Sequence, residues 1–151
     1  YVPRGESREI RPPGAEEADK DVTRDRKAFT AAIRTRIFTF LRGLVIEDFE
    51  AALANLDSTS DPDGQPWTAD RLGAAMDGYY KDHRQLCLDP NARNIRNTYV
   101  LPAEDHRSWR VQQMLIDPDE HNDWVAEFEV DLVQSREAQA PSLRLRKIGA
   151  L

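Results

Sequence analysis

Apolar residues in the first half of the chain recur at helical spacing. This spacing predicts a first helix over residues 23–41, with Thr23 as its N-terminal cap and Gly43 as its terminator. Two further stretches predict shorter helices over residues 46–56 and 68–83, and the second of these begins at a capping threonine. The apolar stripe of the first helix, which we expect to be buried, is formed by Phe29, Ile33, Ile37, Phe40, Leu41 and Leu44.

Near residue 97 the period of the apolar pattern changes from that of a helix to that of a strand. Alternation of apolar and polar side chains predicts strands over residues 109–116 and 124–132, and a last strand over residues 143–146. Residues 98–101 are expected to form an additional strand. The second half of the chain therefore consists of strands joined by short connections.

Charged residues in the last two strands indicate how these strands pair. In an antiparallel pair, Arg144 and Arg146 would share one face with Glu127, Glu129 and Asp131. Opposite charges on facing strands stabilise such a pair, and a slip by one residue would move the whole set to the other face. We therefore expect cross-strand ion pairs on one face of the sheet and apolar side chains on the other.

The order of the elements, helices first and strands afterwards, predicts the α+β class. We expect three N-terminal helices packed on a curved antiparallel sheet of about four strands. The helices would cover the apolar face of the sheet, which gives a cone with an opening at its wide end. Residues 23–151 would form this single domain.

Residues 1–22 differ from the rest of the chain. Prolines and glycines interrupt a polar sequence there, and no apolar periodicity is present. We interpret the segment as an extended linker or arm, because it offers too little apolar surface to fold by itself. Since the chain begins at Tyr1, we also expect it to be part of a longer protein.

The composition of the chain argues against some classes of function. The chain has 151 residues and a net charge of −6, and this acidic balance argues against a general binder of polyanions. Its single cysteine, Cys87, excludes an internal disulfide and favours a reducing compartment, so we expect a cytoplasmic location. No stretch approaches the roughly 18 consecutive apolar residues of a membrane span, so no membrane partner is expected.

Motifs of common active sites do not occur in the sequence. There is no GxxxxGK[ST] phosphate loop, no GxGxxG, no HExxH and no CxxC pair. We therefore assign no catalytic residue, no cofactor and no metal ligand from motifs.

The segment 117–123 collects carboxylates and one imidazole, His121. Alternating aspartates can bind Ca²⁺ or Mg²⁺, but the glycine of a calcium loop and its bidentate glutamate are missing. We interpret the segment as a solvated hairpin turn, in which proline and aspartate have their usual roles. His83 is expected near the end of the third helix, where a positive charge is favoured, and a structural role suffices for it.

Two sets of residues are candidates for binding. Aromatic side chains near the opening of the cone, together with one histidine, would line a small-molecule pocket, although core packing is the favoured interpretation. These candidate pocket residues are Tyr80, His83, Trp109 and Trp124. Basic side chains provide the second set, because a guanidinium group binds phosphate through two parallel hydrogen bonds. The candidates for contact with RNA or DNA are Arg34, Arg36, Arg42 and Lys147.

Three stretches of the sequence resemble a known family. They are Phe38–Leu44 continuing through Asp48–Leu53, Trp109–Leu115 continuing to Trp124, and Leu143–Gly149. They resemble the uncharacterised region that follows the motor in a set of bacterial DEAD/DEAH-box helicases, and the likeness covers most of the chain. The resemblance implies an accessory domain whose partners are the motor domains of the same chain. Because no Walker A or DExH motif occurs, ATP hydrolysis is assigned to no residue.

The order of the elements is also similar to that of the nuclear-transport-factor-2-like (cystatin-like) superfamily. The similarity rests on three helices, an acidic second helix after a glycine turn, and strands that carry Trp109, Val111 and Trp124. It implies a cone-shaped fold. Members of that superfamily include enzymes with a pocket, ligand binders and pure association modules, so the likeness alone does not supply a function.

Three functions follow from these observations. The leading hypothesis is a non-catalytic accessory domain that contacts the helicase motor, RNA or DNA, or another partner. The alternative is a small-molecule binder or enzyme that uses the opening of the cone, and a third is a homodimer formed through the outer face of the sheet. A deep pocket with a convergent polar pair would favour the alternative. A flat, charged, well-paired sheet face over a filled interior would favour the accessory role.

Overall fold

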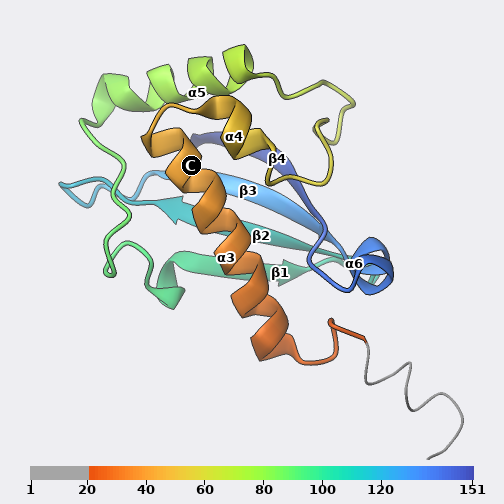
Figure 1. Cartoon of the computed structure of the whole chain (residues 1–151). Coiled ribbons are helices and arrows are strands. Elements are labelled where there is room, and N and C mark those ends of the chain that lie inside the picture. The colour runs from red at the N-terminus through yellow and green to blue at the C-terminus, as the bar shows by residue number, and fades with distance from the viewer. Residues whose placement is uncertain (1–20) are drawn as a thin grey trace, which may run out of the picture.

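The computed structural model describes residues 21–151 and has the expected α+β class (Figure 1). The expected linker therefore lies, up to residue 20, outside the described residues. A short 3-10 helix, Ile95–Asn97, precedes the first strand. The helices are α3 (Arg26–Val45), α4 (Phe49–Leu53), α5 (Ala69–Asp82) and α6 (Leu132–Ala138). The strands are β1 (Thr98–Pro102), β2 (Ser108–Leu115), β3 (Trp124–Asp131) and β4 (Leu143–Ala150).

The four strands form one open antiparallel sheet in the order β1-β2-β3-β4. Strand β2 pairs with β3 so that Val111 faces Phe128, and β3 pairs with β4 so that Phe128 faces Leu145. A β-bulge interrupts the second register between Glu127 and Phe128. The expected antiparallel arrangement of the strands is thus confirmed.

Helix α3 lies across one face of the sheet and supplies most of the helical side of the core (Figure 1). Its two ends are fixed by edge-to-face aromatic pairs, Phe29 on Trp109 at 5.3 Å and Phe40 on Phe128 at 5.4 Å between ring centroids. Each such pair adds about 0.5–1.5 kcal/mol to the stabilisation from buried area. The apolar stripe expected for this helix is buried in full: Phe29, Ile33, Ile37, Phe40, Leu41 and Leu44.

Each helix begins at a residue whose side chain accepts a backbone N–H of the first turn. Such caps satisfy donors that have no partner inside the helix, and each is worth about 1 kcal/mol. The capping residues are Asp25 for α3, Asp48 for α4, Thr68 for α5 and Asp131 for α6.

Three expected helix boundaries were wrong, and the last strand, expected over residues 143–146, continues to Ala150. Helix α3 is capped by Asp25 rather than Thr23, whose backbone N–H and hydroxyl instead donate to Asp21. It also continues through Gly43 to Val45, because Gly43 is packed against α4 and does not turn the chain. The second helix is only the five residues of α4, since Asp48 fixes its start. Helix α6, which follows β3 directly, was not expected at all.

The loop between α4 and α5 covers the start of the outer edge of β4. The backbone N–H of Asp57 donates to the carbonyl of Leu143 at 2.8 Å, and Ser58 forms a parallel bridge with Arg144. The backbone groups at the start of this edge strand are therefore already paired. Within residues 21–151, no helix is long and apolar enough to cross a membrane.

Candidate functional site

The outer face of the sheet carries a network of ion pairs between β3 and β4. Arg144 Nη2 lies 2.9 Å from Glu129 Oε1, Arg146 Nη1 lies 3.1 Å from Glu129 Oε2, and Arg146 Nε lies 3.0 Å from Glu127 Oε2. This confirms the expected strand register and cross-strand charge pairing. Asp131, which was expected to join the network, instead caps α6.

Glu127 is the most deeply placed member of this network, and 6% of its surface is exposed. Gln112 Nε2 on β2 donates to Glu127 Oε1 at 2.8 Å, opposite the bond from Arg146. Burial acts to raise the pKa of Glu127, but the hydrogen bonds from Gln112 and Arg146 and the charges of Lys147 and Arg146 outweigh it. The pKa of Glu127 therefore lies below its ordinary value, and the side chain is a fixed anion at neutral pH.

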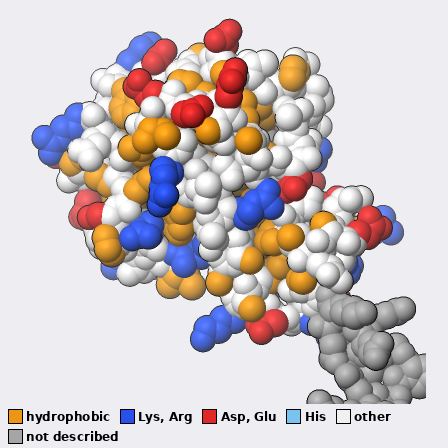
Figure 2. Space-filling model, viewed as in Figure 1, with side chains coloured by type: hydrophobic (Ala, Val, Ile, Leu, Met, Phe, Trp, Pro, Cys, Tyr) orange, Lys and Arg blue, Asp and Glu red, His pale blue; other side chains and the backbone are white. Residues whose placement is uncertain are grey.

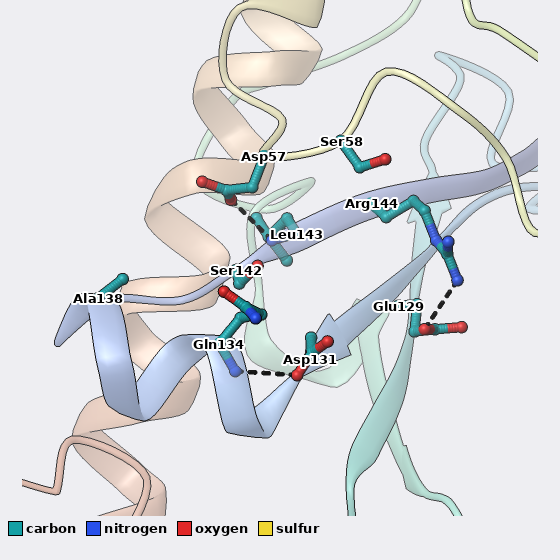
Figure 3. A pocket seen from close by; sticks show the side chains of 9 residues that line it. All are labelled: Asp57, Ser58, Glu129, Asp131, Gln134, Ala138, Ser142, Leu143 and Arg144. Atoms are coloured by element: carbon teal, nitrogen blue, oxygen red, sulfur yellow. Dashed lines mark hydrogen bonds and ion pairs between the residues drawn. The ribbon is translucent and has the colours of Figure 1, made fainter.

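A hollow of about 430 Å³ lies beside this network, between the ends of β3 and β4 and helix α6 (Figure 3). Its carboxylates are all engaged by the protein. Asp57 accepts the backbone N–H of Leu143 at 2.7 Å, Asp131 accepts that of Gln134 at 2.9 Å, and Glu129 is ion-paired. The acidic lining is thus used to hold the fold. The hollow is lined by Asp57, Ser58, Glu129, Asp131, Gln134, Ala138, Ser142, Leu143 and Arg144.

The structure brings together three of the four candidate pocket residues. Tyr80, His83 and Trp124 surround the ring of Tyr79, at centroid distances of 5.3, 4.6 and 5.4 Å. Trp109 lies near the start of β2, away from this group. Its ring packs on Phe29 and is covered by the guanidinium of Arg26. The four residues therefore do not line one pocket.

Tyr79 is the centre of this aromatic group. It is fully buried, and its hydroxyl donates to the carbonyl of Gln85 at 3.2 Å. Burial raises the pKa of Tyr79 above its ordinary value, and it does the same for Tyr80. Both hydroxyls are therefore protonated at neutral pH.

Two of the four candidate nucleic-acid contacts have their donors engaged inside the fold. Arg34 Nε donates to Thr98 Oγ1 at 3.2 Å. Arg36 Nη1 donates to the carbonyl of Pro141 at 2.6 Å, and its Nη2 lies 2.9 Å from Asp57. The other two candidates, Arg42 and Lys147, are exposed.

Charge is unevenly spread on the face of the molecule that carries α3 (Figure 2). Acidic side chains gather over α4 and α5, whereas basic side chains are scattered among apolar and uncharged ones along α3 and below it. This face therefore offers no continuous basic track of the kind that follows a nucleic-acid backbone.

A group of histidines and carboxylates forms where α5 meets the β2–β3 loop. Asp117 Oδ2 lies 3.2 Å from His121 Nδ1 and 3.8 Å from His83 Nδ1, and His83 Nε2 lies 2.9 Å from Asp123 Oδ1. The side chains of His83 and Asp117 are each 2% exposed, whereas that of His121 is 54% exposed. Together His83, Asp117 and His121 offer three ligand atoms within 4.8 Å of one another.

The expected turn at residues 117–123 is confirmed, and Asp117 organises it. Its carboxylate accepts the backbone N–H groups of Asp119, His121 and Asn122, at 3.2, 2.9 and 3.3 Å. Burial acts to raise the pKa of Asp117, but the N–H groups of Asn122 and His121 and the nearby His121 side chain lower it below its ordinary value. No local pattern predicts that His83 joins this turn, because strands β1 and β2 separate it from the loop in the chain.

Comparison with known proteins gives one finding. The sequence model of a protein family described as a domain of unknown function (DUF3516) matches residues 3–148. No curated protein and no solved structure matches the chain. The matched span contains every described helix, strands β1 to β3 and most of β4.

Proposed function

The chain belongs to the DUF3516 family, and from this premise we propose that it is a non-catalytic accessory domain attached to the C-terminal side of a DEAD/DEAH-box helicase motor. The sequence resemblance described above motivates the helicase partner. The proposal includes a nuclear-transport-factor-2-like arrangement of the helices over the sheet, and a cytoplasmic location in keeping with the free Cys87.

One observation carries the proposal: a paired, charged outer sheet face lies over a filled interior. On the inner side, Phe40 and Phe128 are fully buried in edge-to-face contact, so side chains fill the space where a substrate would bind in a hollow cone. On the outer side, Arg144, Arg146 and Glu129 remain 20–34% exposed while held in fixed ion pairs. This is the combination that favours an accessory role over a small-molecule pocket.

The pattern of the outer face suits a protein partner better than a polyanion. Fixed charges of both signs alternate there, and such a pattern is matched by a surface of complementary charges, which gives specificity and register. A nucleic-acid backbone instead requires cations that are free of local anions. We therefore place the motor contact on the outer sheet face.

The first test is the reading frame upstream of Tyr1, which we expect to encode a DEAD/DEAH-box motor.

The second test is calorimetry of the binding of residues 21–151 to that motor. It compares the affinity of the unchanged domain with that of the Arg110→Glu variant. Arg110 is exposed and faces Glu129 across β2 and β3, so its reversal changes the outer face without entering the core. We expect affinity to fall by about tenfold or more. Arg42→Glu on α3 is the matched control and should leave motor affinity unchanged. Absence of a motor upstream, or equal affinity for both variants, would contradict the proposal.

Direct contact with RNA or DNA is a second candidate function, because Arg42 and Lys147 are exposed. Anisotropy of a labelled single-stranded RNA, and of the same sequence in DNA, should rise with protein at low salt and fall as salt is added. Arg42→Glu and Lys147→Glu should each weaken this binding, whereas Lys81→Glu, which changes another exposed cation on α5, should not. No change in anisotropy at low salt would exclude this function for the domain.

A further inference from the structure

We propose that His83, Asp117 and His121 form a binding site for a divalent transition-metal ion, with Zn²⁺ as the best-fitting ion. The site would join the C-terminal end of α5, where His83 follows the last helical residue, to the loop between β2 and β3. It is independent of the accessory function proposed above. Neither the family description nor any sequence motif assigns a metal to these residues.

The distances between the candidate ligand atoms fit a small metal ion. Zinc binds histidine nitrogen and carboxylate oxygen at about 2.0–2.2 Å, so two ligands of a tetrahedral ion lie about 3.3 Å apart. Asp117 Oδ2 is 3.2 Å from His121 Nδ1 and 3.8 Å from His83 Nδ1. All three ligand atoms lie within 4.8 Å of one another, so modest side-chain rotation brings them into one coordination sphere.

His83 supplies the observation that points to a ligand. Its side chain is 2% exposed, yet neither ring nitrogen makes a hydrogen bond. Nε2 does lie 2.9 Å from Asp123 Oδ1, but the carboxylate is not aligned with the N–H direction, and the nearest carboxylate oxygen to Nδ1 is 3.8 Å away. A buried imidazole is normally hydrogen-bonded, because an unsatisfied polar atom in the interior is costly. A metal ion on Nδ1 satisfies that nitrogen directly.

The surroundings of His83 also match those of a metal-binding histidine. A histidine that binds a metal through one nitrogen generally directs the other N–H at a carboxylate, which fixes the ring and its tautomer. With Nδ1 facing Asp117 and His121, the remaining Nε2 faces Asp123. A small rotation of the exposed Asp123 side chain would complete this hydrogen bond.

Asp117 is held ready to act as the carboxylate ligand. Its Oδ1 accepts the backbone N–H groups of His121 and Asn122, which fixes the carboxylate, and its Oδ2 faces both imidazoles. The carboxylates of Asp117 and Asp123 bring two negative charges to the site, which a divalent cation neutralises.

The ligand types select the class of ion. Two imidazoles with one carboxylate favour Zn²⁺ and its neighbours among the transition metals, whereas Mg²⁺ and Ca²⁺ prefer sites made only of oxygen. Three ligands from the chain leave a fourth position of a tetrahedral ion to water or to a group from a bound partner. His121 is 54% exposed, so the site is open to solvent on the side of this residue.

The test uses untagged protein treated with a chelator and then titrated with Zn²⁺ by calorimetry, with Mg²⁺ as a separate titrant. We expect one Zn²⁺ per chain, no comparable Mg²⁺ binding, and a higher melting temperature with Zn²⁺ because the ion binds the folded state. ¹⁵N spectra of the histidine rings should show that Nδ1 of His83 and His121 binds the metal.

Three variants decide whether these residues are the ligands. His121→Ala should weaken Zn²⁺ binding by about tenfold or more while the protein stays folded, since this side chain is exposed. Asp123→Asn should weaken it by about tenfold through loss of the partner to His83. His106→Ala removes the remaining histidine, which lies in the β1–β2 turn, and should leave affinity unchanged.

Absence of Zn²⁺ binding would overturn the proposal. So would equal affinity in the wild type and His121→Ala, or an equal loss of affinity in His106→Ala, because binding would then not depend on this group of residues. Mg²⁺ binding as tight as that of Zn²⁺ would also overturn it.

Discussion

Single residues on the outer face of the sheet show how charge is accommodated at low exposure. Glu127 is 6% exposed, and a buried carboxylate without partners is strongly destabilising. Gln112 and Arg146 each donate to it from a neighbouring strand, at 2.8 and 3.0 Å. The anion is thus stabilised by donors from both sides, and it links β2, β3 and β4.

The depressed pKa of Glu127 predicts a pH dependence of stability. Because its pKa in the folded state lies below the ordinary value of 4.5, ionised Glu127 contributes stability that is complete above that value. This contribution is lost as the pH falls below 4.5 and through the folded-state pKa. Glu127→Gln should therefore be less stable than the wild type near neutral pH, and the difference should shrink in acid. Urea unfolding across this pH range measures it, and a difference that does not change with pH would contradict the assignment.

At the level of residues, the sequence predicted what depends on alternation along a strand. The pairing of Arg144 and Arg146 with Glu127 and Glu129 follows from the two-residue period, and the structure has it. The position of His83 beside the β2–β3 loop depends on how α5 packs on the sheet, which no local pattern encodes.

At the level of elements, the contact between α3 and α4 depends on one glycine. A Cβ atom added at Gly43 would lie 2.7 Å from Ala52 Cβ and 2.8 Å from Ala52 Cα, which is closer than atoms in contact approach. Since Ala52 is fully buried, the two helices cannot move apart without disturbing the core. Gly43 therefore sets the distance between these helices.

Two glycine substitutions within helices should have opposite effects on stability. Gly43→Ala should lower the free energy of unfolding by about 1–3 kcal/mol, because overpacking outweighs the better helix propensity of alanine. Gly78→Ala in α5 should raise it by up to about 1 kcal/mol, since its new Cβ would lie at an ordinary 3.4 Å from Trp124. Chemical denaturation of both variants measures this. If Gly43→Ala were stabilising, α4 would have shifted away from α3 at little cost, and the prediction would be wrong.

The elements that the sequence predicted are those with several turns or a clear alternation. Helix α5 and strands β2 and β3 were expected within one or two residues of their observed bounds. Helix α6 has only seven residues, which is too few to show a helical period. Its signal in the sequence was Asp131, a residue type that caps helices. The excess length expected for α4 arose because apolar residues beyond Leu53 pack from a loop rather than from a helix.

At the level of the whole molecule, Arg36 joins segments that are distant in the chain. From α3 it donates to the carbonyls of Asn55 and Pro141 and to the carboxylate of Asp57. It thereby connects the long helix to the loop after α4 and to the turn that enters β4. This is why a residue that the sequence suggested for nucleic-acid contact is better understood as part of the scaffold.

Arg36→Ala should destabilise the whole fold, whereas Arg42→Ala should not. Loss of the guanidinium leaves the carbonyls of Asn55 and Pro141 without this donor and leaves Asp57 with only the N–H of Leu143, so we expect a cost of about 1–3 kcal/mol, given partial exposure of the site. Arg42 is exposed on the same helix, so its removal should change stability by less than about 0.5 kcal/mol. Thermal and urea unfolding compare the two. Equal stability of both variants would show that Arg36 does not hold these segments together.

The loop segment around Asp57 and Ser58 has a consequence for how copies of the chain can join. It blocks the start of β4, whereas β1, at the opposite end of the strand order, has no segment bridged to its outer edge among the described residues. Two copies that met along β1 would use up that edge in both. A third copy would then meet β4, whose start is already paired, so extension into open-ended fibrils would be hindered by this route.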